Sequence, residues 1–103
     1  MSEKIKLYFK DELIGQLIYF EDRYIFKVVD EFSSESILSM LNFKKGEIQE
    51  SNDLFYIFHR FIPDKNRTDI YSKADIKATD NEFQILLKVS KLNLDRDQFW
   101  IGG

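Results

Sequence analysis

Apolar and polar residues alternate along the first third of the chain. Residues 4–9 alternate, with Ile5, Leu7 and Phe9 on one face, and the same period of two returns in residues 24–29. This period is typical of a strand that buries one face. Residues 13–20 are also β-rich, and Gly15 among them indicates a bulge or a close backbone approach. Polar turns separate the segments, so the pattern predicts three consecutive strands in an antiparallel meander.

A helical period replaces the alternation near the middle of the chain. The spacing i, i+1, i+4, i+7 and i+8 places one set of apolar side chains on one face of a helix: Leu54, Phe55, Phe58, Phe61 and Ile62. Pro63 lacks an amide hydrogen and disfavours helical dihedrals at the residue before it, so we expect the helix to end there. Ser51 or Asn52 is expected to cap its first turn. Polar residues then form an exposed corner, namely Asp64, Lys65, Asn66 and Arg67.

The remaining segments complete the expected fold. Residues 37–43 are either a strand or an irregular core segment, residues 44–47 a loop, and residues 68–73 a short helix with Ile70 and Tyr71 facing inward. Thr79 and Glu82 have the spacing of a capping box, and a broad apolar face follows them and ends near Asn93.

The last apolar segment, residues 97–101, is either a closing edge strand or an exposed anchor. Strands followed by helices predict the α+β class, here an antiparallel meander sheet with two to three helices packed on one face. The length of 103 residues fits a single domain over residues 1–103.

Composition narrows the class of protein. The chain is 44% hydrophobic, which is enough for an ordered core, and it contains no cysteine, which fits a reducing compartment. We find no signal peptide and no run of the roughly 20 apolar residues that cross a bilayer, so we expect a soluble cytoplasmic protein without membrane contact. The net charge of -3 is too mild to imply a polyanion-binding surface.

Candidate catalytic groups are sparse. His59 is the only histidine and lies beside Arg60, without a second histidine or a cysteine to complete a metal site or a triad. The run His59-Arg60-Phe61 is superficially like the start of a kinase catalytic loop, but the aspartate that serves as base is missing. We therefore expect a protein that is not an enzyme and that holds no cofactor or metal.

Two further patterns are better explained as ordinary structure. Asn93, Asp95 and Asp97 have the spacing with which a calcium loop begins, yet Gln98 replaces its glycine, so we expect a solvated turn. The aromatic segment 23–28 lacks the glycines of an RNA-binding strand and the net charge has the wrong sign, so we expect no direct nucleic-acid binding.

The order of four motifs resembles the N-terminal subdomain of HipA-type serine/threonine kinase toxins. That subdomain typically has a V-G-x-L strand, an F-x-Y strand, an L-S-L-S-L-P run and a helix ending in F-F-x-x-L-L-P followed by Glu or Asp. Here the corresponding segments are L-I-G-Q-L at 13–17, Y-I-F-K-V at 24–28, L-S-M at 38–40 and F-Y-I-F-H-R-F-I-P-D at 55–64. Residues 83–87 stand where the family has its F-x-L-L helix, and Arg96-Asp97 where it has a G-x-D turn.

In full-length HipA proteins the kinase core follows this subdomain on the same chain, whereas the resemblance leads us to expect a free-standing subdomain here. A free-standing chain of this kind is similar to the HipS-like antitoxins of split HipBST toxin-antitoxin systems. The resemblance implies that it binds and neutralises a HipT-like serine/threonine kinase toxin, in a ternary complex that also includes a HipB-like helix-turn-helix DNA-binding protein. ATP and magnesium would then belong to the kinase.

The resemblance also indicates the docking residues. We expect the corner after the helix to contact the kinase, through Phe61, Pro63, Asp64, Lys65, Asn66 and Arg67. The family often has E-G-W at the corner where this chain has Asp64-Lys65-Asn66, so no bulky aromatic is available there. Trp100 is a second candidate anchor, and the alternative is a ring that closes the sheet edge.

An alternative function is a structural or activating subunit that completes a truncated kinase, and a weaker one is a small nucleic-acid-binding module.

Overall fold

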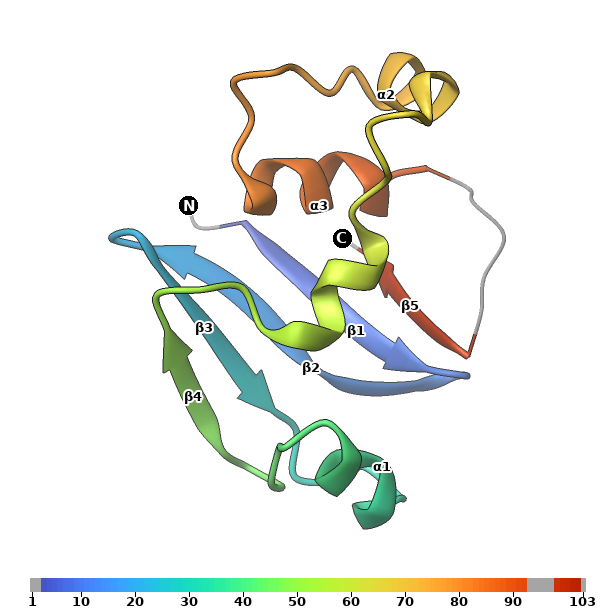
Figure 1. The fold of residues 1–103 in the computed structure, drawn as a ribbon. Helices are drawn as coiled ribbons and strands as arrows, with labels where there is room; N and C mark the ends of the chain where they lie inside the picture. Colours follow the sequence, from blue (N-terminus) through green and yellow to red (C-terminus); the bar gives the residue numbers. More distant parts are fainter. Residues whose placement is uncertain (1–2, 93–97, 103) are drawn as a thin grey trace.

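One antiparallel sheet of five strands forms the scaffold of the α+β fold (Figure 1). The computed structural model describes residues 3–92 and 98–102. The sheet has the order β4-β3-β2-β1-β5 and contains β1 (Lys4–Phe9), β2 (Glu12–Phe20), β3 (Arg23–Val28), β4 (Ile48–Ser51) and β5 (Phe99–Gly102). The predicted meander is confirmed as β1 to β3, and the C-terminal segment is confirmed as an edge strand, paired with β1.

The sequence pattern missed the other edge strand. Residues 48–51 pair with β3, with Ile25 opposite Glu50 and Phe26 opposite Gln49, although we expected a loop followed by a helix cap in this region. The strand has only four residues, and its one large apolar side chain, Ile48, lies on the exposed side, so the sequence shows no buried period here. Tertiary pairing with a preformed strand, rather than local propensity, makes this segment extended.

Gly15 produces both of the effects expected from it. The register between β1 and β2 shifts after Leu7, which pairs with Gly15, whereas Tyr8 pairs with Leu13, so Ile14 is the extra residue of a bulge. A Cβ at position 15 would lie 2.3 Å from the Lys27 carbonyl oxygen of the neighbouring strand. The backbones therefore approach each other too closely for any side chain.

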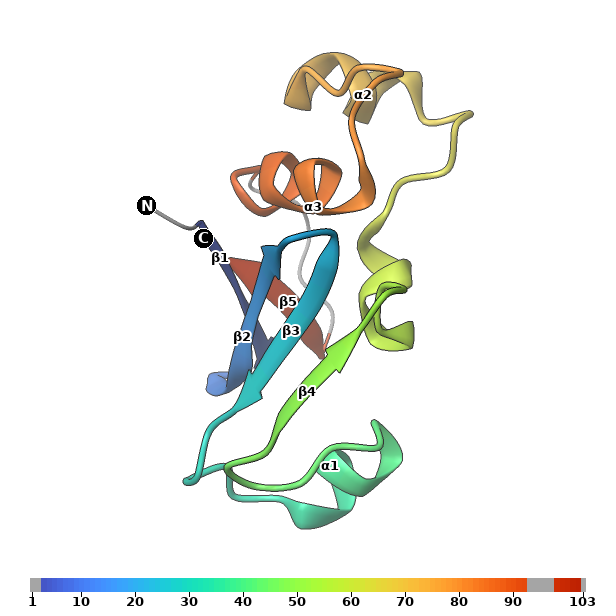
Figure 2. The same ribbon diagram turned by 90° about the vertical axis from the view of Figure 1, so that its left-hand side faces the viewer.

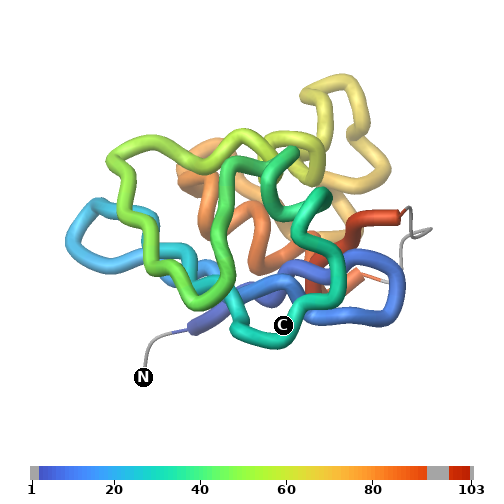
Figure 3. The backbone as a smooth tube through the Cα atoms, turned by 90° about the horizontal axis from the view of Figure 1, so that it is seen from below, coloured from blue at the N-terminus to red at the C-terminus, as the bar shows by residue number. Residues whose placement is uncertain are grey.

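Three α-helices and one 3-10 helix occur in the described residues. They are α1 (Glu35–Met40), η1 (Tyr56–Phe61), α2 (Thr68–Ala74) and α3 (Glu82–Ser90). The short helix expected near residue 68 is confirmed, with Ile70 buried and Tyr71 half-buried. The expectation of a strand or an irregular core segment in residues 37–43 was wrong for residues 37–40, which belong to α1 and follow the Ser34 hydroxyl that accepts the Ile37 amide at 3.3 Å. Residues 41–43 are irregular, with Phe43 in the core, as one of the two alternatives had it. Figure 3 shows α1 and β4, in green, at the end of the molecule nearest the viewer.

The central helix differs from the α-helix that we expected. It is a 3-10 helix of six residues, preceded by an extended Phe55 that makes no side-chain cap. Ser51 does not cap it, because Ser51 belongs to β4 and its hydroxyl accepts the Asp53 amide instead. A 3-10 helix has three residues per turn, so Phe55, Phe58 and Phe61 lie in one row along it. The same aromatic side chains can therefore share one face in this helix as in the expected α-helix. The helix does end before Pro63, as predicted, since Ile62 is extended.

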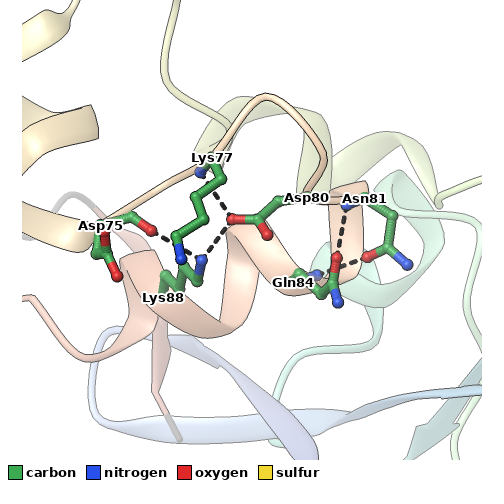
Figure 4. Close-up of polar contacts among 6 residues, drawn as sticks. All are labelled: Asp75, Lys77, Asp80, Asn81, Gln84 and Lys88. Atoms are coloured by element: carbon green, nitrogen blue, oxygen red, sulfur yellow. Dashed lines mark hydrogen bonds and ion pairs between the residues drawn. The ribbon is translucent and has the colours of Figure 1, made fainter.

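The capping box of α3 lies two residues later than predicted. Asn81 Oδ1 accepts the Gln84 amide and Gln84 Oε1 accepts the Asn81 amide, both at 2.8 Å (Figure 4). Thr79 and Glu82 therefore do not form the box. The helix ends at Ser90, not near Asn93 as expected, and Asn93 itself lies outside the described residues.

The helices cover one face of the sheet. In Figure 2 η1 lies to the right of the strands, α3 and α2 lie above them, and α1 lies at the lower end, while β1 and β2 form the left-hand boundary. Phe26 in β3 is fully buried beneath Phe43 and Phe58, whose ring centroids lie 4.5 and 5.6 Å away. Phe83 and Leu86 of α3 join the same core. The predicted arrangement of helices on a single face follows from this packing.

Candidate partner-binding surface

The polar corner after η1 is a defined turn. Asp64 Oδ1 accepts the Asn66 amide at 3.0 Å, and the Asp64 carbonyl accepts the Arg67 amide at 2.9 Å. An aspartate that binds the backbone two residues ahead mimics a backbone turn and restricts the chain locally. The shape of the corner is therefore set by hydrogen bonds among its own residues.

The turn is attached at both ends to packed elements. On its N-terminal side, the Pro63 carbonyl accepts the Tyr71 hydroxyl of α2 at 3.1 Å. On its C-terminal side, Arg67 Nε and a second guanidinium nitrogen lie 3.4 and 3.5 Å from the two carboxylate oxygens of Asp69. The Arg67 guanidinium holds the pKa of Asp69 below its usual range, although both side chains are exposed. Surface pairs of this kind add little stability, so the Pro63–Tyr71 contact is the more important constraint.

The six residues expected to bind a partner divide into two groups. Asp64, Lys65, Asn66 and Arg67 are exposed, and their side chains are available to another protein. Phe61 and Pro63 are half-buried, and Phe61 packs against Phe58 with a centroid distance of 6.5 Å. The six lie in one short segment, residues 61–67, because they are neighbours in the sequence.

A groove runs beside η1, on the same segment of chain. It has a volume of about 640 Å³ and lies between the end of α1, the outer side of η1 and Phe99 of β5. Tyr56 and Met40 border it and are 93% and 62% exposed. The Arg60 guanidinium lies 5.2 Å from the centre of the Phe99 ring, in a cation–π arrangement. Exposed Tyr and Arg are residue types that anchor protein interfaces.

Sequence reasoning did not single out Tyr56 or Met40. A signal was present for Tyr56, because the helical period excluded it from the apolar face that contained its neighbours. An aromatic residue on the outer side of a short helix is a candidate contact residue. Met40 gave no such signal, because the helix α1 that exposes it was itself not predicted.

The remaining candidates for chemistry have ordinary structural surroundings. His59 is exposed, as expected, and its Nδ1 lies 3.6 Å from Glu82 Oε2. Within residues 3–92 and 98–102, no three His, Asp or Glu side chains gather as a metal site would require. The calcium-like spacing at Asn93, Asp95 and Asp97 lies outside the described residues, as does the Arg96-Asp97 turn.

Trp100 has the environment of a ring that closes the sheet edge. Its ring stacks on Tyr8 of β1 with centroids 4.0 Å apart and an angle of 7° between the planes. Its indole N–H donates to the Lys10 carbonyl at 2.6 Å. The side chain is half-buried and packs β5 onto β1, so Trp100 is the ring that closes the sheet edge.

Comparison of the chain with known protein families, with curated proteins and with solved structures found no match in any of the three. No helix in the described residues has the length and apolar character needed to cross a membrane.

Proposed function

We propose that this protein is a non-catalytic, HipS-like antitoxin that binds and inhibits a HipT-like serine/threonine kinase toxin. The proposal starts from the resemblance of the chain to the N-terminal subdomain of HipA-type kinases. The observation that supports it most directly is the corner of residues 64–67. Four consecutive exposed polar side chains are presented there on a turn fixed by its own hydrogen bonds.

Inhibition by occlusion fits this geometry. In the proposed complex the corner docks near the nucleotide-binding loop of the kinase, and η1 supports it from behind. A turn that is already ordered loses little conformational entropy on binding, so more of its contact energy appears as affinity. Arg67 and Lys65 offer cationic donors and Asp64 a carboxylate, which are groups that a kinase nucleotide site can engage through its own charged residues.

The test is a binding and phosphorylation assay with the cognate kinase. Size-exclusion chromatography of the mixture should give a complex, and autophosphorylation of the kinase should fall when this protein is added. Changing Asp64, Lys65, Asn66 and Arg67 together to Ala should weaken binding by at least about 2 kcal/mol, roughly thirtyfold, if the corner is the energetic centre of the interface.

A matched variant controls for charge and for general surface change. Asp11, Ser39, Lys44 and Lys91 are also exposed, and changing them to Ala removes the same number of positive and negative charges. This variant should bind and inhibit as the parent protein does. Equal binding by the corner variant would show that the corner is not the docking site.

The sign of the effect distinguishes the proposed antitoxin from a subunit that completes a truncated kinase. An activating subunit would form the same complex but would raise phosphorylation. A HipB-like DNA-binding protein added to the mixture should enter the complex without displacing this chain from the kinase.

A further inference from the structure

The face of the sheet opposite the helices forms a second, separate surface. We call it the open face and define it by the outward positions of the five strands. None of these residues is buried: Lys4, Lys6, Tyr8, Leu13, Gln16, Ile18, Phe20, Arg23, Ile25, Lys27, Ile48, Glu50, Trp100 and Gly102. With strands about 4.8 Å apart and about six residues long, the open face measures on the order of 20 Å in each direction.

Aliphatic side chains lie across the middle of the open face. Ile18 of β2 pairs directly with Ile25 of β3, and both side chains are half-buried. Ile48 on the edge strand is 61% exposed and Phe20 is 58% exposed. These are two of the four large hydrophobic side chains that are exposed in the described residues. Exposed apolar residues that share a face rimmed by charge are typical of interaction surfaces.

The charge of the open face is opposite to that of the whole chain. It carries four basic residues and one acidic residue, whereas the chain has 15 basic and 18 acidic residues in total. The single acid, Glu50, lies 3.5 Å from Arg23. Within the described part of the chain no ion pair involves Lys4, Lys6 or Lys27. The positive charge is therefore segregated on this face and is not balanced there.

We infer that the open face docks a partner protein through an aliphatic patch rimmed by carboxylates. The apolar centre of such a partner would cover Ile18, Ile25 and Ile48, and its acidic rim would meet the lysines. Complementary charge of this kind selects the partner and speeds association, while the apolar centre supplies most of the affinity.

Charge and ring geometry argue against two other occupants. A second copy of this chain packed face to face would bring the same lysines together, and like charges across an interface cost several kcal/mol. A single-stranded nucleic acid needs free ring faces for its bases. Here Tyr8 and Trp100 stack on each other at 4.0 Å, so each ring hides one face of the other.

The open face is separate from the corner of residues 64–67. The corner joins η1 to α2, and η1 packs on the helix-covered side of the sheet through Ile57 and Phe58. Both surfaces are therefore accessible at once, and this inference stands whether or not the corner binds a kinase.

A titration of the ¹⁵N-labelled 103-residue chain with defined probes tests the inference. The main probe is an amphipathic helical peptide of about five turns with Leu on one face and Glu on the other. The comparison probes are the same peptide with Lys in place of Glu, and an oligothymidylate. We expect the Leu/Glu peptide to shift backbone amide resonances of β1, β2 and β3, and to leave those of residues 64–67 in place.

Charge-reversal variants make the test specific. Lys4→Glu with Lys27→Glu should weaken binding of the Leu/Glu peptide at least tenfold. Lys44→Glu with Lys91→Glu, which changes exposed lysines outside the open face by the same charge, should leave it unaltered. Dispersed amide resonances of each variant establish that it is folded.

Several results would overturn the inference. They are the absence of any shift with the Leu/Glu peptide, shifts confined to another surface, and equal binding of the Lys-containing peptide. Stronger binding of the oligothymidylate would instead assign the open face to single-stranded nucleic acid.

Discussion

Substitution of Gly15 by alanine tests the strand register at the centre of the sheet. The added Cβ would lie 2.3 Å from the Lys27 carbonyl oxygen and 2.7 Å from Phe26 Cζ. Real Cβ atoms essentially never come closer than 3.0 Å to such neighbours, so β2 and β3 would have to separate locally by about 0.7 Å. The Phe26 ring has no room to move away, because it is fully buried against Phe43 and Phe58.

The expected cost of this substitution is about 3 kcal/mol. Overpacking a core with one extra carbon costs roughly 1–3 kcal/mol, and a clash with backbone that is fixed in a sheet belongs at the upper end. For a domain of this length each kcal/mol lowers the melting temperature by about 4–8 °C, so we expect a decrease of roughly 12–24 °C. Circular dichroism measured during thermal and urea unfolding would give both quantities.

Gly102→Ala is the matched control for this prediction. Its added Cβ would meet only Tyr8 and Trp100 side-chain atoms at 3.5 and 3.6 Å, which is ordinary van der Waals contact. We expect its free energy of unfolding to stay within about 0.5 kcal/mol of the parent value, as for most surface substitutions. Equal stability of Gly15→Ala and Gly102→Ala would refute the bulge and the register of β2.

Three further predictions concern pH and the sheet edge. Burial raises the pKa of Tyr24 to about 12. The unfolded chain releases this proton first, so the parent protein should lose stability between pH of about 10 and 12. Tyr24→Phe should lose less stability over the same range. The Lys77 backbone amide and the Lys88 ammonium lower the pKa of Asp80. The stability that this carboxylate contributes is therefore present above about pH 4 and is lost as the pH falls through its folded pKa. The free energy of unfolding of Asp80→Asn should lack this acid-dependent part. Trp100→Phe keeps a ring beside β1 but removes the indole N–H that binds the Lys10 carbonyl, and urea unfolding should show a loss of about 1 kcal/mol.

Each of these three has a clear contrary result. Superimposable alkaline unfolding curves for Tyr24→Phe and the parent would show that the hydroxyl is not protected by burial. An unchanged acid limb for Asp80→Asn would place the acid sensitivity in other carboxylates. Full stability of Trp100→Phe would mean that the indole hydrogen bond adds nothing measurable to the pairing of β5 with β1.

The sequence by itself determined the meander and the identity of much of the core. A period of two defines which side chains of β1 and β3 face inward, because successive strand residues point to opposite sides. The effects of Gly15 and Pro63 were also predictable. Glycine has no Cβ to obstruct a close backbone approach, and proline has no amide hydrogen to continue a helix. The composition of the corner at residues 64–67 also followed directly from the order of residues.

Tertiary structure decided the elements with weak local signals. β4 has four residues and becomes a strand because β3 offers it a ladder of backbone partners. η1 is a 3-10 helix instead of an α-helix because the row Phe55, Phe58 and Phe61 packs on the sheet with three residues per turn. The start of α3 moved to Asn81 because two spacings along the chain offered a capping box, and only the fold selects between them.

The two candidate interaction surfaces differ in the same way. The corner can be located from sequence because a proline and four polar residues follow one another in the chain. The open face gathers Ile18, Ile25 and Ile48 from three strands with the lysines of β1 and β3, and their shared side is set by strand order and register. Local sequence fixes which residues are polar or apolar, but only long-range pairing brings distant ones onto one surface.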